Sequence, residues 1–346
     1  MIALAELPDR RVEGWRWSDL RAAANKVGGL DAAPADGNFL LAVSEAADGR
    51  SEFRAASPIA SLAQSIRGHD AALYEVGENA DRTISLDLKA VAGAGAHRLE
   101  FRVKRGGVLR LRETWAGEEG AMGALSLRIT AEAGGRIERV VISEAAPGAV
   151  LLSDAQLELA AEARFDQVVI ATGARLSRFE TGLEISGRAA QVSMNGIYLA
   201  AAGLHADLTS HVVLDAEAAE VRQLVRGAAR KGGRGVFQGK FLVERSAQKA
   251  DADMQHNALL LEEGAEVFAK PELEIYADDV QCAHGNTAGQ LNEDAIFYLR
   301  QRGIPDAEAR AMITRAFLIE VLPDWLDGKL RGEAEARIDQ WLGTAP

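Results

Sequence analysis

Cysteine is almost absent from this sequence, which has one, Cys282, among 346 residues. A single thiol excludes an internal disulfide framework, and it excludes a zinc or cluster site built only from cysteines of this chain. No stretch approaches the roughly 20 apolar residues that span a membrane. The N-terminal run 1–11 has no basic segment followed by a long apolar one, so it does not predict a signal peptide. We therefore expect a cytoplasmic protein with no membrane partner.

Basic residues are also scarce relative to acidic ones, which gives a formal net charge of −12. This balance disfavours nucleic acid or an anionic membrane as a main partner. Apolar residues at 48% and charged residues at 26% are typical of a folded domain and argue against disorder. At this length the chain can hold one large core or two to three smaller domains.

Nucleotide-binding motifs are missing as well. No GxGxxG follows a predicted strand, and there is no Walker A sequence and no CxxC pair, so we expect no ATP site of that kind. The run Gly232-Gly233-Arg234-Gly235 is like a phosphate loop in composition, but no helix follows it, which favours a turn between strands. Arg226, Arg230, Lys231 and Arg234 form a basic cluster that could meet an acidic partner or a flavin phosphate. A solvated turn is the simpler interpretation of that cluster.

From about residue 72 to 285 the chain alternates apolar and polar residues in short runs, as in Leu99, Phe101 and Val103. This period of two is typical of strands with one buried face. Small residues and glycine separate the runs, and Asn195-Gly196 is the exception in a region with almost no hairpin signals. Many strands with few hairpins favour a solenoid of stacked coils. On the pattern alone, a β-sandwich or a pair of barrels stays open.

Both ends of the chain have helical patterns. We expect a helix after Ser18-Asp19, a short strand over 39–43 and a helix near 58–66. In the C-terminal part, Asn292 is a good N-cap for a helix that ends at Gly303, and two amphipathic helices follow. The sequence thus predicts a mainly β protein with helical ends. Its expected parts are an N-terminal helical region 1–71, a β core 72–288 and a C-terminal helical domain 289–346.

Cys282 and His284 are the strongest candidates for chemistry. With Val280 they alternate along a short predicted strand that Gly285 ends, so the thiol and the imidazole share a face. A thiolate and an imidazole suit a soft metal ion, although either residue alone is more often structural. The pair cannot complete the ligand set of an iron–sulfur cluster, so further ligands must come from outside this segment.

Other histidines are weaker candidates. His256 lies in an acidic run and could bind a metal, but we favour a solvated corner for it, with Asn257 stacked inward. His205 and His211 flank an apparent turn together with Asp207, and all three are expected at the surface.

Longer motifs around the cysteine resemble a known family. The segment Cys282-Ala283-His284-Gly285 follows an acidic turn and precedes Gly289-Gln290-Leu291 and a helical run from Phe297 to Ile304. This order is similar to the C-terminal signature of the SufB/SufD family, the scaffold proteins of the SUF iron–sulfur cluster assembly machine. It looks closest to the SufD branch, because the additional cysteine-containing N-terminal region of many SufB proteins is not seen. The N-terminal run from Arg10 to Leu20 resembles the start of the same family.

The resemblance implies a right-handed parallel β-helix between helical ends, in a scaffold rather than an enzyme. It implies pairing with SufB through the terminal strands, with SufB completing a transient Fe–S cluster at Cys282 and His284. A lowered thiol pKa would then favour ligation. It also implies that the C-terminal helices dock the ATPase SufC. We further expect that the complex binds a reduced flavin and that the isolated chain pairs with itself. The residues that match the docking segment are Met312, Ile313, Ala316 and Phe317.

Two other functions compete with this one. A β-helix carbohydrate-active enzyme would place paired carboxylates in a groove lined with aromatics, yet only 5% of the residues here are aromatic and such enzymes are usually secreted. A self-sufficient metal-binding homodimer would combine two copies of the Cys282–His284 pair and would hold iron without another protein.

Overall fold

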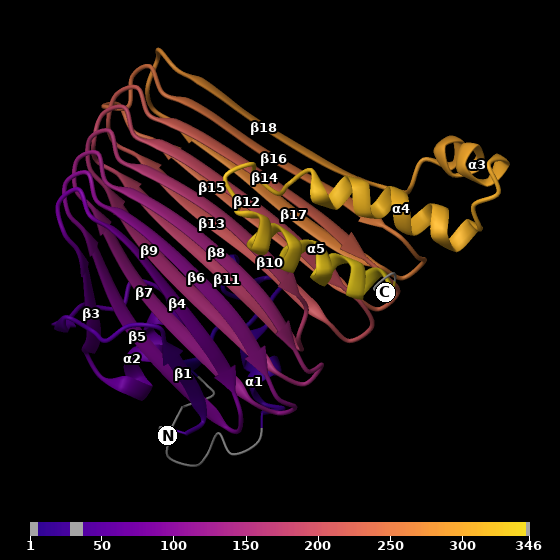
Figure 1. Cartoon of the computed structure of the whole chain (residues 1–346), viewed down its shortest axis with the longest axis horizontal. Helices are drawn as coiled ribbons and strands as arrows, with labels where there is room; N and C mark the ends of the chain where they lie inside the picture. Colours follow the sequence, from indigo (N-terminus) through magenta and orange to yellow (C-terminus); the bar gives the residue numbers. More distant parts are fainter. Residues whose placement is uncertain (1–5, 28–36, 344–346) are drawn as a thin grey trace.

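The computed structural model describes residues 6–27 and 37–343. Over these residues the chain is a solenoid of stacked β coils with helices at both ends (Figure 1). Neighbouring strands within each sheet are parallel, except at the N-terminal end. There each sheet begins with one short strand that pairs antiparallel with its neighbour. The predicted parallel β-helix between helical ends is confirmed, and the parallel pairing excludes the sandwich and the barrels.

Two nine-stranded sheets form the walls of the solenoid, and successive strands alternate between them. Sheet A contains, in spatial order, β1 (Phe39–Val43), β4 (Asp81–Ala90), β6 (Val108–Gly117), β8 (Arg136–Ala145), β10 (Arg164–Thr172), β12 (Gln191–Ala200), β14 (Glu220–Ala229), β16 (Asp251–Leu260) and β18 (Gln281–Gly289). Sheet B contains β2 (Gly49–Glu52), β3 (Asp70–Val76), β5 (Ala94–Val103), β7 (Met122–Ala131), β9 (Val150–Leu159), β11 (Leu176–Ile185), β13 (His205–Leu214), β15 (Arg234–Val243) and β17 (Glu266–Ile275).

The coils differ in length, which hides the repeat in the sequence. Register partners lie 26 residues apart for Val150 and Leu176, and 32 apart for Arg234 and Glu266. The hairpin signal Asn195-Gly196 lies inside β12 and makes no turn. A Cβ atom at position 196 would lie 2.7 Å from Leu208 Cδ1, so this glycine serves interior packing.

One corner of the solenoid repeats the same left-handed backbone conformation in successive coils. Gly134 has φ +69° there, and its N–H donates to Ala161 O of the next coil at 2.9 Å. Glycine adopts this conformation without steric cost. The equivalent corners of later coils use Glu162, Ala189 and Ala218, with φ of 56 to 58°. Backbone hydrogen bonding between coils therefore sets this corner, whatever the residue type.

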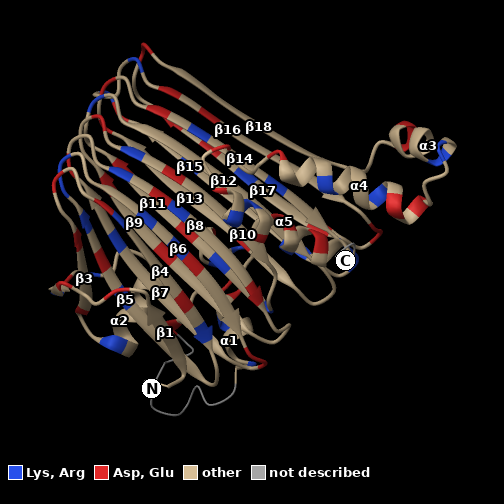
Figure 2. Cartoon of the chain, viewed as in Figure 1, with Lys and Arg blue, Asp and Glu red and all other residues tan. Residues whose placement is uncertain are grey.

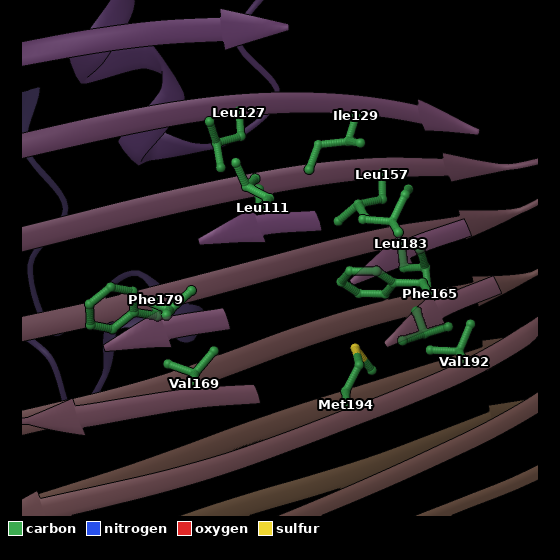
Figure 3. Close-up of a cluster of buried hydrophobic side chains, with 14 of the residues drawn as sticks. Leu111, Leu127, Ile129, Leu157, Phe165, Val169, Phe179, Leu183, Val192 and Met194 are labelled. Atoms are coloured by element: carbon green, nitrogen blue, oxygen red, sulfur yellow. The ribbon is translucent and has the colours of Figure 1, made fainter. Parts of the chain in front are cut away.

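Alternating side chains of both sheets fill the interior, and most are apolar. Figure 3 shows part of this cluster, including Leu127 and Phe165. A fully buried ion pair interrupts it, because Arg139 Nε donates to Glu113 Oε1 at 2.7 Å. The same guanidinium donates to Gln167 Oε1 at 2.8 Å, so both charges are hydrogen-bonded inside the solenoid.

Helices cover the outer faces of both sheets. The helix α2 (Pro58–Arg67) packs on β5, β7 and β9 of sheet B. The last two helices, α4 (Asp306–Ile319) and α5 (Gly328–Leu342), pack on sheet A through residues such as Leu318 and Ile338. Between the solenoid and α4, α3 (Glu293–Gln301) projects from the body (Figure 1). Its predicted N-cap is confirmed, since Asn292 Oδ1 accepts from Asp294 N.

Two residues of the basic cluster, Arg226 and Arg230, hold the C-terminal helices, so the expected solvated turn was wrong for them. Lys231 lies in an exposed turn, as expected, and Arg234 pairs with Glu266 of β17. The Arg226 guanidinium lies 4.6 Å from the Phe317 ring centroid, donates to Phe317 O and pairs with Glu320. The Arg230 guanidinium lies 4.4 Å from the ring centroid of Trp341 on α5. Cation–π contacts and hydrogen bonds thus connect β14 to both helices.

The N-terminal segment crosses the outer face of sheet B. It comprises the 3-10 turn η2 (Glu13–Trp15) and α1 (Leu20–Ala24). The Arg178 guanidinium lies 4.0 Å from the ring centroid of buried Trp15. The Ser18 hydroxyl donates to the Asp207 carboxylate, which also accepts from Arg178 Nη1 at 2.7 Å. The expectation that Asp207 and His205 lie at the surface was wrong, because this segment covers them. His211 is exposed, as expected.

Candidate functional site

The last coil of the solenoid leaves both of its strands at a sheet edge. In the described part of the chain, β17 pairs only with β15 and β18 pairs only with β16 (Figure 1). An edge strand exposes unpaired N–H and C=O groups that can pair with another chain. Most side chains of β18 are exposed, whereas those of β16 alternate between buried and partly exposed. This coil is therefore open along two strands of nine and ten residues.

Cys282 and His284 lie on one face of β18, as their spacing predicted. Cys282 is opposite Ala252 of β16 and is half-buried against the solenoid core, and His284 is opposite Met254 and is exposed. The strand continues to Gly289, so the expected end at Gly285 was wrong. Among residues 6–27 and 37–343, no group of three or more His, Cys, Asp and Glu side chains could hold a metal ion. The pair supplies two donors beside an open edge.

The Cys282 thiol does not meet the expectation of a lowered pKa. Burial raises its pKa, the Asp251 carboxylate adds to this effect, and a hydrogen bond from the Ala252 backbone opposes it. In the chain by itself the group is thus held as a thiol. A metal ion or a cation from a partner would have to displace its proton before the sulfur could act as a ligand.

His256 is a buried residue that the sequence analysis placed wrongly on a solvated corner. Its ring stacks on Phe237, with centroids 4.9 Å apart and planes at 5°, and it has no exposed surface. Tyr198 OH lies 2.9 Å from Nε2, and Asn286 Oδ1 lies 2.7 Å from Nδ1. Because an amide oxygen only accepts, Nδ1 carries the proton and Nε2 accepts from Tyr198. Burial lowers the pKa of His256 to about 4, so the ring is neutral at pH 7.

This hydrogen bond fixes the terminal strand from inside the solenoid. Asn286 is on the same face of β18 as His284, two residues further on, and His256 holds its side chain. The alternation of Ala252, Met254 and His256 on β16 is the signal that could have predicted an inward histidine. Asn257 points outward and donates to Thr287 Oγ1 at 2.7 Å, so its predicted inward stacking was wrong.

The residues proposed for ATPase docking divide between the surface and the interior of the helical part. Met312 is 45% exposed and Ala316 is also exposed, one turn apart on α4. Ile313 packs against the small cluster under α3, and Phe317 packs against the cluster under α4 and α5. On α3, Phe297 and Tyr298 are 63% and 57% exposed, which is unusual for such large apolar rings. The α3–α4 arm therefore presents apolar side chains to solvent.

Charges of both signs are interspersed over the solenoid (Figure 2). Many form pairs between adjacent coils, such as Arg222 with Asp251 at 2.5 Å and Lys240 with Glu274 at 2.8 Å. No helix in the described ranges has the length and apolar character needed to cross a membrane.

The sequence matches one protein-family profile and several known proteins. A profile of the family described as SUF system FeS cluster assembly, SufBD core domain, matches residues 88–317. The chain is 36% identical over 170 residues to the iron-sulfur cluster assembly protein SufD of Escherichia coli (strain K12), covering 49% of this chain and 40% of that protein. It is 32% identical over 179 residues to the chloroplastic protein ABCI7 of Arabidopsis thaliana, covering 51% and 38%. The aligned parts thus span about two fifths of these relatives.

Proposed function

The chain belongs to the SufBD core family of the SUF iron–sulfur cluster assembly system, as its terminal motifs predicted, and we propose that it is a non-catalytic scaffold subunit of that system. Its similarity to SufD proteins supports a role in Fe–S cluster assembly. The observation that carries the finer proposal is the open last coil, where Cys282 and His284 share a face beside two unpaired strand edges.

A partner with the same kind of solenoid would complete this coil. The open edges of β17 and β18 offer ladder hydrogen bonds, interrupted on β17 at Pro271, which has no N–H to donate, and SufB is the partner that the family suggests. Cys282 and His284 supply two ligands, so the partner would supply the rest of the set for a transient cluster at the seam. The raised pKa of the Cys282 thiol fits this order of events, because the chain alone does not hold a ready thiolate.

The α3–α4 arm is the proposed dock for the SufC ATPase. Met312 and Ala316 would make the contact, whereas Ile313 and Phe317 hold α4 on the body. Since Phe317 lies under Arg226 of β14, a force on α4 would reach the last strands of sheet A through this clamp. ATP-driven movement of SufC could thereby open the seam.

A reduced flavin in the complex stays a prediction. Two of the basic residues considered for its phosphate, Arg226 and Arg230, are engaged with α4 and α5. Self-pairing of the isolated chain would use the same open edges, so homodimer and heterodimer compete for one surface. Family membership favours cluster assembly over a carbohydrate-active enzyme.

The test is anaerobic co-purification of the full chain with SufB and SufC, followed by assay of iron and acid-labile sulfide after a sulfur donor is supplied. The Cys282→Ala/His284→Ala variant is compared with Gln281→Ala, a change of an exposed neighbour on the same strand. We expect all three chains to enter the complex, with a lower cluster yield only in the double variant.

Either of two results would reject parts of the proposal. An unchanged yield in the double variant would make the pair structural, and the chain would then serve only as a spacer and dock. Failure of the unaltered chain to enter any complex would reject the scaffold proposal itself. Iron held by the chain without a partner would favour the self-sufficient homodimer.

A further inference from the structure

A cavity lies between sheet B and the segment that leads into α2, several coils away from the last coil. It measures about 290 Å³, and its floor comes from β7, β9, β11 and β13. The side opposite sheet B is lined by Phe53, Arg54 and Ala56 of the preceding segment and by Ala60 of α2. This volume is close to the lower limit of small-molecule sites in proteins.

Two buried side chains on the floor of the cavity, Ser126 and Asp154, each have one oxygen atom without a hydrogen-bond partner among the described residues. Ser126 is 1% exposed and its Oγ has no hydrogen-bond partner among the described residues. Asp154 has no exposed surface; its Oδ1 accepts from Gln156 Nε2 at 2.6 Å, while Oδ2 has no partner in the same residues. Buried polar atoms of native proteins are nearly always hydrogen-bonded, so an occupant of the cavity would satisfy this pair.

The charges around the cavity are arranged by depth. Arg128 and Glu158 pair with each other at 2.9 Å and Glu184 is exposed, so Asp154 is the buried acid of the lining. Arg54 is exposed and has no ion-pair partner among the described residues. The buried carboxyl group thus comes from the floor of the cavity, and the exposed guanidinium comes from the segment that leads into α2.

The Asp154 carboxyl is suited to a cationic donor. Burial raises its pKa to about 7 and the nearby Glu180 carboxylate adds to the shift, while the hydrogen bond from Gln156, the nearby Ser57 hydroxyl and the charge of Arg139 oppose it. A cation beside Oδ2 would stabilise the ionised form.

We propose that this cavity binds a small zwitterion, with a primary ammonium group at Asp154 Oδ2 and Ser126 Oγ and a carboxylate at Arg54. The ammonium donates to both orphaned oxygens, and the guanidinium receives the acid group at the opening. The site is independent of the last coil, and nothing in this proposal depends on cluster assembly.

The experiment is isothermal titration of the full chain with β-alanine, alongside ethanolamine, which lacks the carboxylate, and propionate, which lacks the ammonium. We expect β-alanine to bind and the two half-ligands to bind weakly or not at all. Asp154→Asn and Arg54→Ala should each weaken β-alanine binding about tenfold or more. Glu263→Gln, an exposed acid in the corner before β17, should bind like the unaltered chain.

Ser126→Ala separates a ligand site from a cavity filled only by water. With a ligand site, this variant folds normally and binds β-alanine less tightly. Equal binding by Asp154→Asn and the unaltered chain would overturn the proposal. It would also be overturned by ordered water alone in crystals grown with β-alanine, or by the absence of any heat of binding.

Discussion

The two ends of the solenoid are closed in different ways. At the N-terminal end, each sheet finishes in a short antiparallel strand, β1 of five residues and β2 of four. Phe39 of β1 enters the core there, next to Trp115, and its carbonyl lies 2.7 Å from His97 Nε2. At the C-terminal end, β17 and β18 are about twice as long and have no covering strand in the described chain.

This difference supports the proposal that the last coil associates with a partner, while the N-terminal end closes the fold. Short edge strands protect a sheet against pairing with other chains, and long open ones favour it. The interior side chains agree with this division. Phe39 is buried where the solenoid is closed, whereas the open end presents the half-buried Cys282 and the exposed His284. Polar side chains at the open end thus stand where an apolar side chain closes the other end.

The largest expected effect is loss of the apolar side chain that closes the N-terminal end. Phe39→Ala should lower the free energy of unfolding by about 3–5 kcal/mol, because it removes a buried ring that a cavity would replace. Space for the ring is specifically provided, since a Cβ atom at Gly123 would lie 2.6 Å from Phe39 Cε2. Denaturant unfolding measures the change, with Leu40→Ala as the control on the same strand, where Leu40 is 48% exposed. Equal effects of the two variants would contradict this closing role.

At the open end, acid should loosen the interior contact that holds β18. The folded pKa of His256 is about 4, below the ordinary 6.5. As pH falls between these values the unfolded chain takes up a proton and the folded chain does not, so stability decreases by about 3 kcal/mol in total. His205, which the N-terminal segment covers in part, also has a pKa lowered to about 4 by desolvation and adds a similar slope.

Urea unfolding at a series of pH values isolates the contribution of His256. The His256→Gln variant should lose less stability than the unaltered chain between pH 6.5 and 4. Identical slopes in the two proteins would show that His256 does not titrate in this interval.

Edge pairing itself can be broken by proline without unfolding the strand. Gln281 N donates to the carbonyl of Ala250, the residue before β16, so the N–H groups of alternate residues after it, including Thr287, face β16. The N–H of Ala288 therefore faces the open edge. Ala288→Pro should weaken pairing with SufB about tenfold or more and leave the fold intact.

Thr287→Pro is the matched control, because it removes a donor to β16 and should destabilise the last coil instead. Thermal unfolding and analytical ultracentrifugation of mixtures with SufB distinguish these results. Normal pairing by a folded Ala288→Pro chain would argue against an interface along this edge.

The smallest expected effect concerns the corners between the two ends. Ala218 has φ +56°, a conformation that costs an alanine more than a glycine. Ala218→Gly should stabilise the chain by about 0.5–1 kcal/mol, since relief of strain exceeds the entropy that glycine adds to the unfolded state. Thermal unfolding detects a change of this size. Destabilisation would show that strain at this corner is negligible.

The sequence allowed good prediction where one local rule decides the structure. Alternation located the strands of the solenoid, and Asn292 predicted the start of α3. The spacing of Cys282 and His284 predicted their common face, because strand geometry alone sets it.

Prediction failed where polar residues find partners far away in the chain. His256, Asp207 and Arg226 all carry groups that single-sequence patterns assign to the surface. Tyr198 hydrogen-bonds the His256 ring, and the N-terminal segment covers Asp207. The Arg226 guanidinium lies against the Phe317 ring. The coil repeat was hidden because the coils differ in length and because backbone hydrogen bonds set the left-handed corner, so glycine does not mark it.

The most direct test of the central claim is amide hydrogen exchange of the full chain, alone and mixed with SufB. The account predicts fast exchange along the open edge of the isolated chain and strong protection of peptides from 266–289 in the mixture. Peptides from 39–52 at the closed end should exchange alike in both samples. Protection at the closed end, or none at the last coil, would contradict the assignment of the open end as the interface.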